Sequence, residues 1–257
     1  MRALSVLILL LWGALVSSSR AAPPDADPAA VLQALDARAN SVTSLRYGVL
    51  RTTVRGGTRS EERWRFVWEQ APGQAFPKLR IDYDGDTQRV IVSDGATLTD
   101  YVPALRKAMR YSLAELPTAR AQELLKAILD KVAVPGFRSG YDPRMRWTWE
   151  QDSSGAYEIV GRDSSSGELR FLLRDDRAAL LRSEIRRGGV FALSVKASEH
   201  QEILPGVWFP RRLELRMPAE AGVGEVSLRV SNLSCAPSPA SLFELRLDPS
   251  VELVAGR

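Results

Sequence analysis

The chain has 257 residues, of which 45% are hydrophobic and 26% are charged, and its formal net charge at pH 7 is +4. This composition is typical of a packed globular protein and excludes a collagen, a coiled coil and a disordered chain. The single cysteine, Cys235, excludes an intramolecular disulfide. Together with the single histidine, His200, it supplies too few ligands for a tetrahedral zinc site.

The first residues have the pattern of a secretory signal peptide. Arg2 precedes an apolar run, Ala3 to Val16, that is too short to span a membrane, and small residues lead to a cleavage position after Ala21. We therefore expect residues 1–21 to be removed on export and residues 22–257 to form a single soluble domain. No cysteine lies at the end of the apolar run, where a lipid would be attached, so no lipid anchor is expected.

Two segments have the spacing of amphipathic helices. The first follows Asp27-Pro28, a favourable N-cap and first-turn pair. The second covers about Thr118–Val132, where apolar residues recur every three or four positions until Pro135-Gly136.

Most of the remaining chain alternates between apolar and polar residues, as antiparallel strands do when one face is dry and the other is wet. The apolar sides of these segments are Trp64, Phe66 and Trp68; Leu79, Ile81 and Tyr83; Met145, Trp147 and Trp149; Leu181 and Ile185; Phe209, Leu213 and Leu215; and Val226, Leu228 and Val230. Turn pairs separate the segments at Asp94-Gly95, Ser154-Gly155, Ser166-Gly167 and Gly188-Gly189. This template predicts about eleven strands.

A sheet of this size must curl, because strongly twisted sheets above about ten strands rarely stay open and flat. One solution is an incomplete barrel with its apolar face inside and the two helices across the opening. The other is a closed barrel or sandwich whose inner faces fill one another. The alternation pattern alone is compatible with both.

Three segments carry a more specific signal. A proline-led strand, Pro77–Tyr83, is followed by a strand that runs into Val-Ser-Asp-Gly-Ala-Thr-Leu at residues 92–98, and then by Tyr101. Together with Gly206–Pro210 and Ser241–Pro249, this order resembles the periplasmic outer-membrane lipoprotein carriers and their lipoprotein-sorting relatives, the LolA-like family.

The resemblance implies a mainly β fold, an incomplete, half-open antiparallel barrel whose helices cover the open face. It also implies a periplasmic protein that shields acyl chains of a lipid or lipoprotein for transfer toward the outer membrane, with an inner-membrane transporter and an outer-membrane acceptor as further partners. Family carriers often have an arginine, implicated in handing cargo onward, directly before the motif proline, where this chain has Phe76. The resemblance therefore supports apolar ligand binding more strongly than lipoprotein hand-over.

We expect the aromatic strand faces and the second helix to form the acyl site, although ordinary core packing explains the same residues. The expected cavity residues are Trp64, Phe66, Trp68, Leu79, Ile81, Tyr83, Trp147, Trp149 and Phe209. The expected lid residues are Leu124, Leu125, Ile128 and Leu129 of the second helix.

No catalytic constellation stands out in the sequence. No G-x-S-x-G motif occurs, and His200 lies in a polar stretch where an exposed side chain is expected. Asp82, Asp84 and Asp86 lack the glycine and glutamate of a calcium loop. We expect a monomer with no catalytic residues, metal, cofactor or nucleic-acid partner. Two rival functions are an envelope-stress sensor that binds mislocalised lipoprotein and an enzyme acting on lipid.

Overall fold

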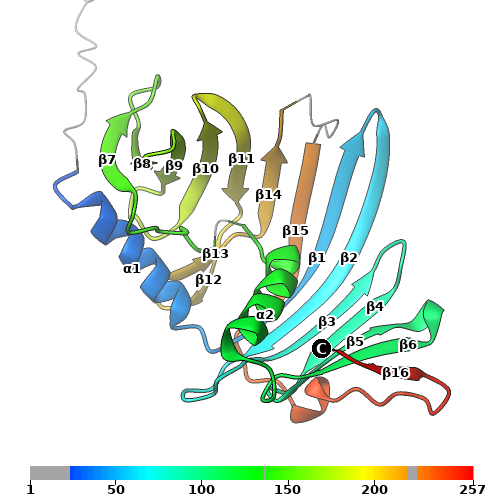
Figure 1. Ribbon diagram of the computed structural model, residues 1–257. Coiled ribbons are helices and arrows are strands. Elements are labelled where there is room, and N and C mark those ends of the chain that lie inside the picture. Colours follow the sequence, from blue (N-terminus) through cyan, green and yellow to red (C-terminus); the bar gives the residue numbers. More distant parts are fainter. Residues whose placement is uncertain (1–23, 136, 219–224, 257) are drawn as a thin grey trace, which may run out of the picture.

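The computed structural model describes residues 24–135, 137–218 and 225–256 (Figure 1). The expected signal peptide, residues 1–21, lies outside the described residues. The strands are β1 (Ser44–Arg55), β2 (Thr58–Glu69), β3 (Lys78–Asp84), β4 (Arg89–Ser93), β5 (Thr97–Val102), β6 (Lys107–Ser112), β7 (Arg146–Gln151), β8 (Tyr157–Arg162), β9 (Gly167–Leu173), β10 (Leu180–Arg187), β11 (Val190–Ser198), β12 (Gln201–Leu204), β13 (Val207–Phe209), β14 (Arg212–Arg216), β15 (Glu225–Ser234) and β16 (Glu252–Ala255). The helices are α1 (Pro28–Asn40) and α2 (Thr118–Val132), with short 3-10 turns at η1 (Pro103–Leu105) and η3 (Ala240–Phe243).

One curved sheet of fourteen strands dominates the molecule (Figure 1). Its order is β16-β6-β5-β4-β3-β2-β1-β15-β14-β11-β10-β9-β8-β7, and β12-β13 form a separate ribbon. Neighbouring strands are antiparallel except for β16, which pairs with β6 in parallel. The two ends of the sheet, β16 and β7, do not pair with each other, so the barrel is incomplete. This confirms the half-open alternative.

Both helices form where the sequence predicts them. The Asp27 carboxylate caps α1 by accepting hydrogen bonds from the backbone N–H groups of Ala29 (3.3 Å) and Ala30 (3.2 Å). Each helix then covers its own region of the sheet, on the side that we call the inner face; the opposite side is the outer face.

The buried residues form two cores on this inner face. The main core joins α2 to strands on both sides of β1, and includes Tyr47, Phe66, Ile81 and Leu125. The second core joins Leu32 and Leu35 of α1 to Ile159, Phe171 and Leu180 of β8, β9 and β10.

The turn between β4 and β5 forms at the Asp94-Gly95 pair that the sequence predicts. Gly95 has a φ of 94°, a backbone conformation that glycine adopts more readily than other residues.

Two details differ from the sequence-based expectation. The structure has more strands than the eleven expected, since strands as short as β13 of the ribbon and β16 of the large sheet fall below the alternation template. The run from Phe209 to Leu215 is also broken: β13 ends at Phe209, β14 begins at Arg212, and Pro210, which has no backbone N–H to donate, lies between them.

The outer face of β7–β10 carries a network of ion pairs. Its most buried member is Glu158, whose side chain is only 4% exposed. The Glu158 carboxylate contacts Arg182 Nη2 at 2.5 Å and Arg170 Nη1 at 3.4 Å. Arg170 and Arg162 extend the network to Glu150 and Glu168. A buried charge of this kind depends on its partners, because removing them leaves a costly unpaired ion.

We predict that Glu158→Gln lowers the free energy of unfolding by about 2 kcal/mol, because the guanidinium groups of Arg170 and Arg182 each lose one carboxylate partner. The loss stays below that of a fully buried pair because both arginines are partly exposed. Urea unfolding measures it. The matched control is Glu252→Gln, which removes an exposed ion pair with Lys107 and should change stability by less than about 0.5 kcal/mol. Equal effects of the two substitutions would contradict the prediction.

Cys235 is a free, half-buried thiol that packs against the main core, and burial raises its pKa. Because the thiolate is the reactive form, we predict that a thiol reagent at pH 8 labels the folded protein at least tenfold more slowly than the urea-unfolded protein. Rapid labelling of the native chain, or a reducible dimer on a gel, would contradict this protection.

Candidate functional site

An apolar cavity of about 680 Å³ lies between α2 and the inner face of the sheet. This volume is within the usual range of about 300–1,000 Å³ for small-molecule sites. The residues that line it are Ala39, Val42, Leu45, Tyr47, Phe66, Trp68, Gln70, Ala75, Phe76, Pro77, Gln122, Leu125, Lys126, Leu129, Asp130, Ala133, Val134, Pro135, Phe137, Arg138 and Phe209.

Aromatic side chains form one wall of this inner cavity. Tyr47 and Phe66 are cross-strand neighbours on β1 and β2, and their ring centroids are 4.9 Å apart. Phe209 lies 5.4 Å from Tyr47, and Phe137 lies 4.8 Å from Phe209. Trp68 follows Phe66 on the same face, because side chains along a strand alternate with a period of two. The row provides a large apolar surface with fixed ring positions.

Helix α2 forms the facing wall with Leu125 and Leu129. Only Ala121, Leu125 and Val132 of this helix are buried. At its C-terminal end the Tyr47 hydroxyl donates a hydrogen bond to the Val132 carbonyl at 3.3 Å. Apart from this bond, apolar packing is the main contact between the helix and the sheet, which suits a cover that can be displaced.

The rim of the inner cavity is polar. Lys126 and Asp130 form an ion pair of 2.5 Å on α2, and Gln122 and Arg138 also line the rim. A second hollow of about 400 Å³ adjoins the rim, lined mainly by the 70–74 loop. Arg138 lines both hollows.

The structure brings only some of the expected site residues together. Phe66, Trp68, Phe209, Leu125 and Leu129 line the inner cavity, whereas Leu79, Ile81, Leu124 and Ile128 pack in or against the main core beside it. Trp147 and Trp149 lie in the second core, where their indole N–H groups donate to the carbonyls of Asp142 (3.0 Å) and Ala26 (2.7 Å). Their expected place in the same cavity is therefore corrected: they pack with α1 near the β7 edge of the sheet.

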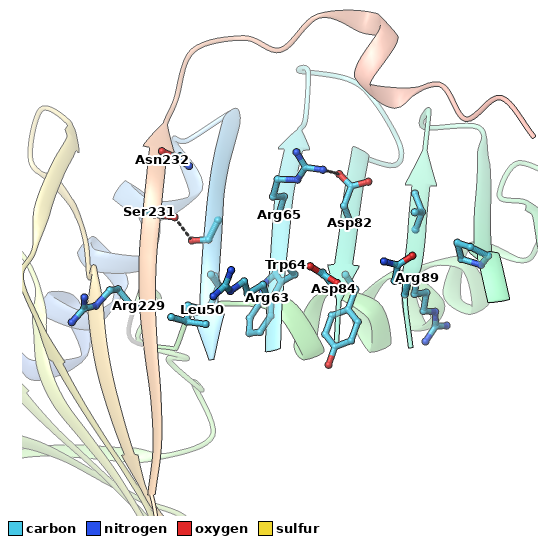
Figure 2. Close-up of a pocket in the computed structure, with 16 residues that line it drawn as sticks. Leu50, Arg63, Trp64, Arg65, Asp82, Asp84, Arg89, Arg229, Ser231 and Asn232 are labelled. Atoms are coloured by element: carbon cyan, nitrogen blue, oxygen red, sulfur yellow. Dashed lines mark hydrogen bonds and ion pairs between the residues drawn. The ribbon is translucent and has the colours of Figure 1, made fainter. Parts of the chain in front are cut away.

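Trp64 and Tyr83 line a different hollow, of about 700 Å³, across β15, β1, β2, β3 and β4 (Figure 2). Their rings stack with centroids 6.3 Å apart, and burial is the first cause that raises the pKa of Tyr83 to about 12. The rest of this hollow mixes apolar residues such as Leu50 and Val90 with charged side chains. Figure 2 shows two of the charged ones, Arg65 and Asp82, pointing toward one another, 3.8 Å apart. Its mixed charge suits an apolar ligand less well than the inner cavity does.

Sequence reasoning missed Tyr47, Phe137 and Arg138 as cavity residues. Tyr47 alternates with Leu45 and Val49, so the same period-two signal could have identified it. Phe137 and Arg138 lie in the connection after α2, where no periodic signal exists.

The structure places the ring of the single histidine, His200, within hydrogen-bonding distance of a backbone carbonyl. His200 is half-buried, not exposed as expected, and its Nε2 lies 3.0 Å from the Leu180 carbonyl. Burial lowers its pKa. Within the described residues, no group of three or more histidine, cysteine or acidic side chains could hold a metal ion.

Neither a protein-family model nor a curated protein matches the sequence. Solved structures do match. A DUF1329 family protein from Desulfovibrio piger has a TM-score of 0.54 at 15% identity over 85% of this chain and 98% of its own. A putative outer membrane lipoprotein-sorting protein domain from Vibrio parahaemolyticus has a TM-score of 0.53 at 14% identity over 83% and 95%.

The chain has the fold of the lipoprotein-sorting proteins. This confirms the resemblance seen in the Val-Ser-Asp-Gly segment and agrees with the unclosed sheet. At these identities the likeness establishes the fold alone. Among the helices of the described residues, none has the length and apolar character needed to cross a membrane.

The inner cavity predicts an unusual response to truncation of Phe66. Because this ring faces open space on one side, Phe66→Ala should cost less than about 2 kcal/mol, below the 3–5 kcal/mol usual for a core phenylalanine. The control is Ile81→Ala on the paired strand position, which lines neither hollow and should cost about 2–5 kcal/mol. Urea unfolding compares them, and a Phe66 loss equal to or above the Ile81 loss would indicate a filled core.

Proposed function

We propose that the protein is a periplasmic lipid- or lipoprotein-binding carrier that holds an acyl chain in the inner cavity between α2 and the sheet. The observation that carries this proposal is the cavity itself: about 680 Å³ of space beside aromatic and aliphatic side chains, with its charged groups exposed at the rim. The shared fold of lipoprotein-sorting proteins and the signal-peptide pattern of residues 1–21 support it.

The energetics favour a long, flexible apolar ligand. Burial of an acyl chain contributes about 0.8 kcal/mol per methylene, so a chain of about 16 carbons gains on the order of 12 kcal/mol before the costs of immobilisation. No step of this binding requires a catalytic group, so the proposal is a non-enzymatic one.

Release is the second requirement of a carrier. Leu124, Ile128 and Leu129 of α2 are only partly buried, and all three pack against the main core. A small shift of α2 toward the sheet lets these side chains occupy the space that a departing acyl chain leaves. The helix then acts as a lid whose own apolar face replaces the ligand.

We predict that the delipidated protein binds a fluorescent fatty-acid probe and that Leu129→Trp, which fills the cavity, weakens binding at least fivefold. The control is Ala127→Trp, which adds the same side chain at an exposed position of the same helix. Probe titration measures both, and quenching of tryptophan emission should report on Trp68 in the cavity wall. Absence of probe binding, or equal binding by Leu129→Trp and the parent protein, would refute the proposal.

A further inference from the structure

Arg138 stands out as a cation at the boundary between an apolar and a polar space. It lines the inner cavity together with Phe66, Leu125 and Leu129, and it lines the adjoining hollow together with the 70–74 loop. A ligand that extends from the apolar cavity into the adjoining hollow therefore lies beside this guanidinium.

The backbone on both sides of Arg138 is held in place. The Phe137 ring packs on Phe209 with centroids 4.8 Å apart. On the other side, the Asp36 carboxylate of α1 accepts hydrogen bonds from the backbone N–H groups of Ser139 (2.7 Å) and Tyr141 (3.3 Å). These contacts hold the backbone beside Arg138 at the rim, and the exposed Arg138 side chain extends from it.

The Arg138 side chain has no hydrogen-bond or ion-pair partner among the described residues. The other charges that line the two hollows are Lys126 and Asp130, and these already neutralise each other in an ion pair. The rim therefore carries one uncompensated positive charge beside an apolar cavity. Most arginines on the sheet, by contrast, have carboxylate partners, as Arg80, Arg89 and Arg162 do.

We propose that the ligand is an anionic amphiphile: its acyl chain fills the inner cavity, and its carboxylate or phosphate accepts hydrogen bonds from Arg138. A guanidinium fits both anions because it presents paired N–H donors in one plane. This inference rests on the proposed function and narrows it, because an acyl group attached only through neutral esters or amides places no anion at the rim. The hollow of about 400 Å³ beside Arg138 provides room for a headgroup larger than a carboxylate.

Three probes test this recognition on the full mature chain: palmitate, palmitoyl lysophosphatidate and the neutral monopalmitoylglycerol. Isothermal titration at neutral pH, below the concentration at which each probe aggregates, measures Kd for the parent protein and for Arg138→Gln. We expect Arg138→Gln to weaken binding of at least one anionic probe about tenfold and to leave the neutral probe within twofold. Added salt should weaken anionic binding to the parent protein and have little effect on the neutral probe. The anionic probe whose affinity falls more identifies the class of ligand. A larger loss for palmitate indicates a free fatty acid, and a larger loss for palmitoyl lysophosphatidate indicates a phospholipid.

The matched control is Arg46→Gln, which removes an exposed arginine from the outer face of β1. It should change none of the three affinities. Equal binding of neutral and anionic probes that Arg138→Gln does not alter would overturn the anionic specificity and leave the carrier function standing. Failure of all three probes to bind would overturn the carrier function and this inference together. Since Arg138 is exposed, thermal unfolding of Arg138→Gln should match that of the parent protein.

Discussion

The structure depends on one constraint: the apolar inner face of a sheet that does not close must be covered. A closed barrel satisfies this requirement with the sheet itself, because opposite walls fill the interior. Here β7 and β16 do not pair with each other, so two helices must cover the inner face. α1 covers the strands near β8–β10 tightly, and the two helices together do not fill the remaining space over β1 and β2. The inner cavity is the space that remains unfilled between α2 and the inner face of the sheet.

Two regions of the sheet use different means of stabilisation. Near β8–β10, α1 packs on a dense core, and the outer face carries the ion-pair network around Glu158. Near β1 and β2, α2 rests on apolar contacts and one hydrogen bond from Tyr47. Opening energies differ between regions of a protein according to such contacts. We therefore expect α2 to open at a lower free-energy cost than α1.

Much of this arrangement could be predicted from the sequence because its signals are local. The spacing of Leu125 and Leu129 defines one face of α2, and the alternation of Phe66 and Trp68 places both on one side of β2. Alternation does not say which core a face joins, and in a sheet this wide Trp147 and Phe66 share the inner side yet lie in different cores. No signal in the sequence indicates the proposed role of Arg138, because that role depends on where a loop, a helix and a strand meet.

The short strand β16 has a consequence for the behaviour of the molecule in solution. Without it, β6 would present a row of unpaired backbone N–H and C=O groups at the edge of the sheet, and such an edge is a template for strands of other chains. β16 covers these groups in parallel register from Glu252 to Ala255, opposite Lys107 to Arg110. β16 is itself only four residues long and begins with a charged side chain. It therefore presents few backbone groups with which a strand of another chain could pair. An open sheet gains a cavity at the risk of self-association, and β16 limits that risk at the β6 edge of the sheet.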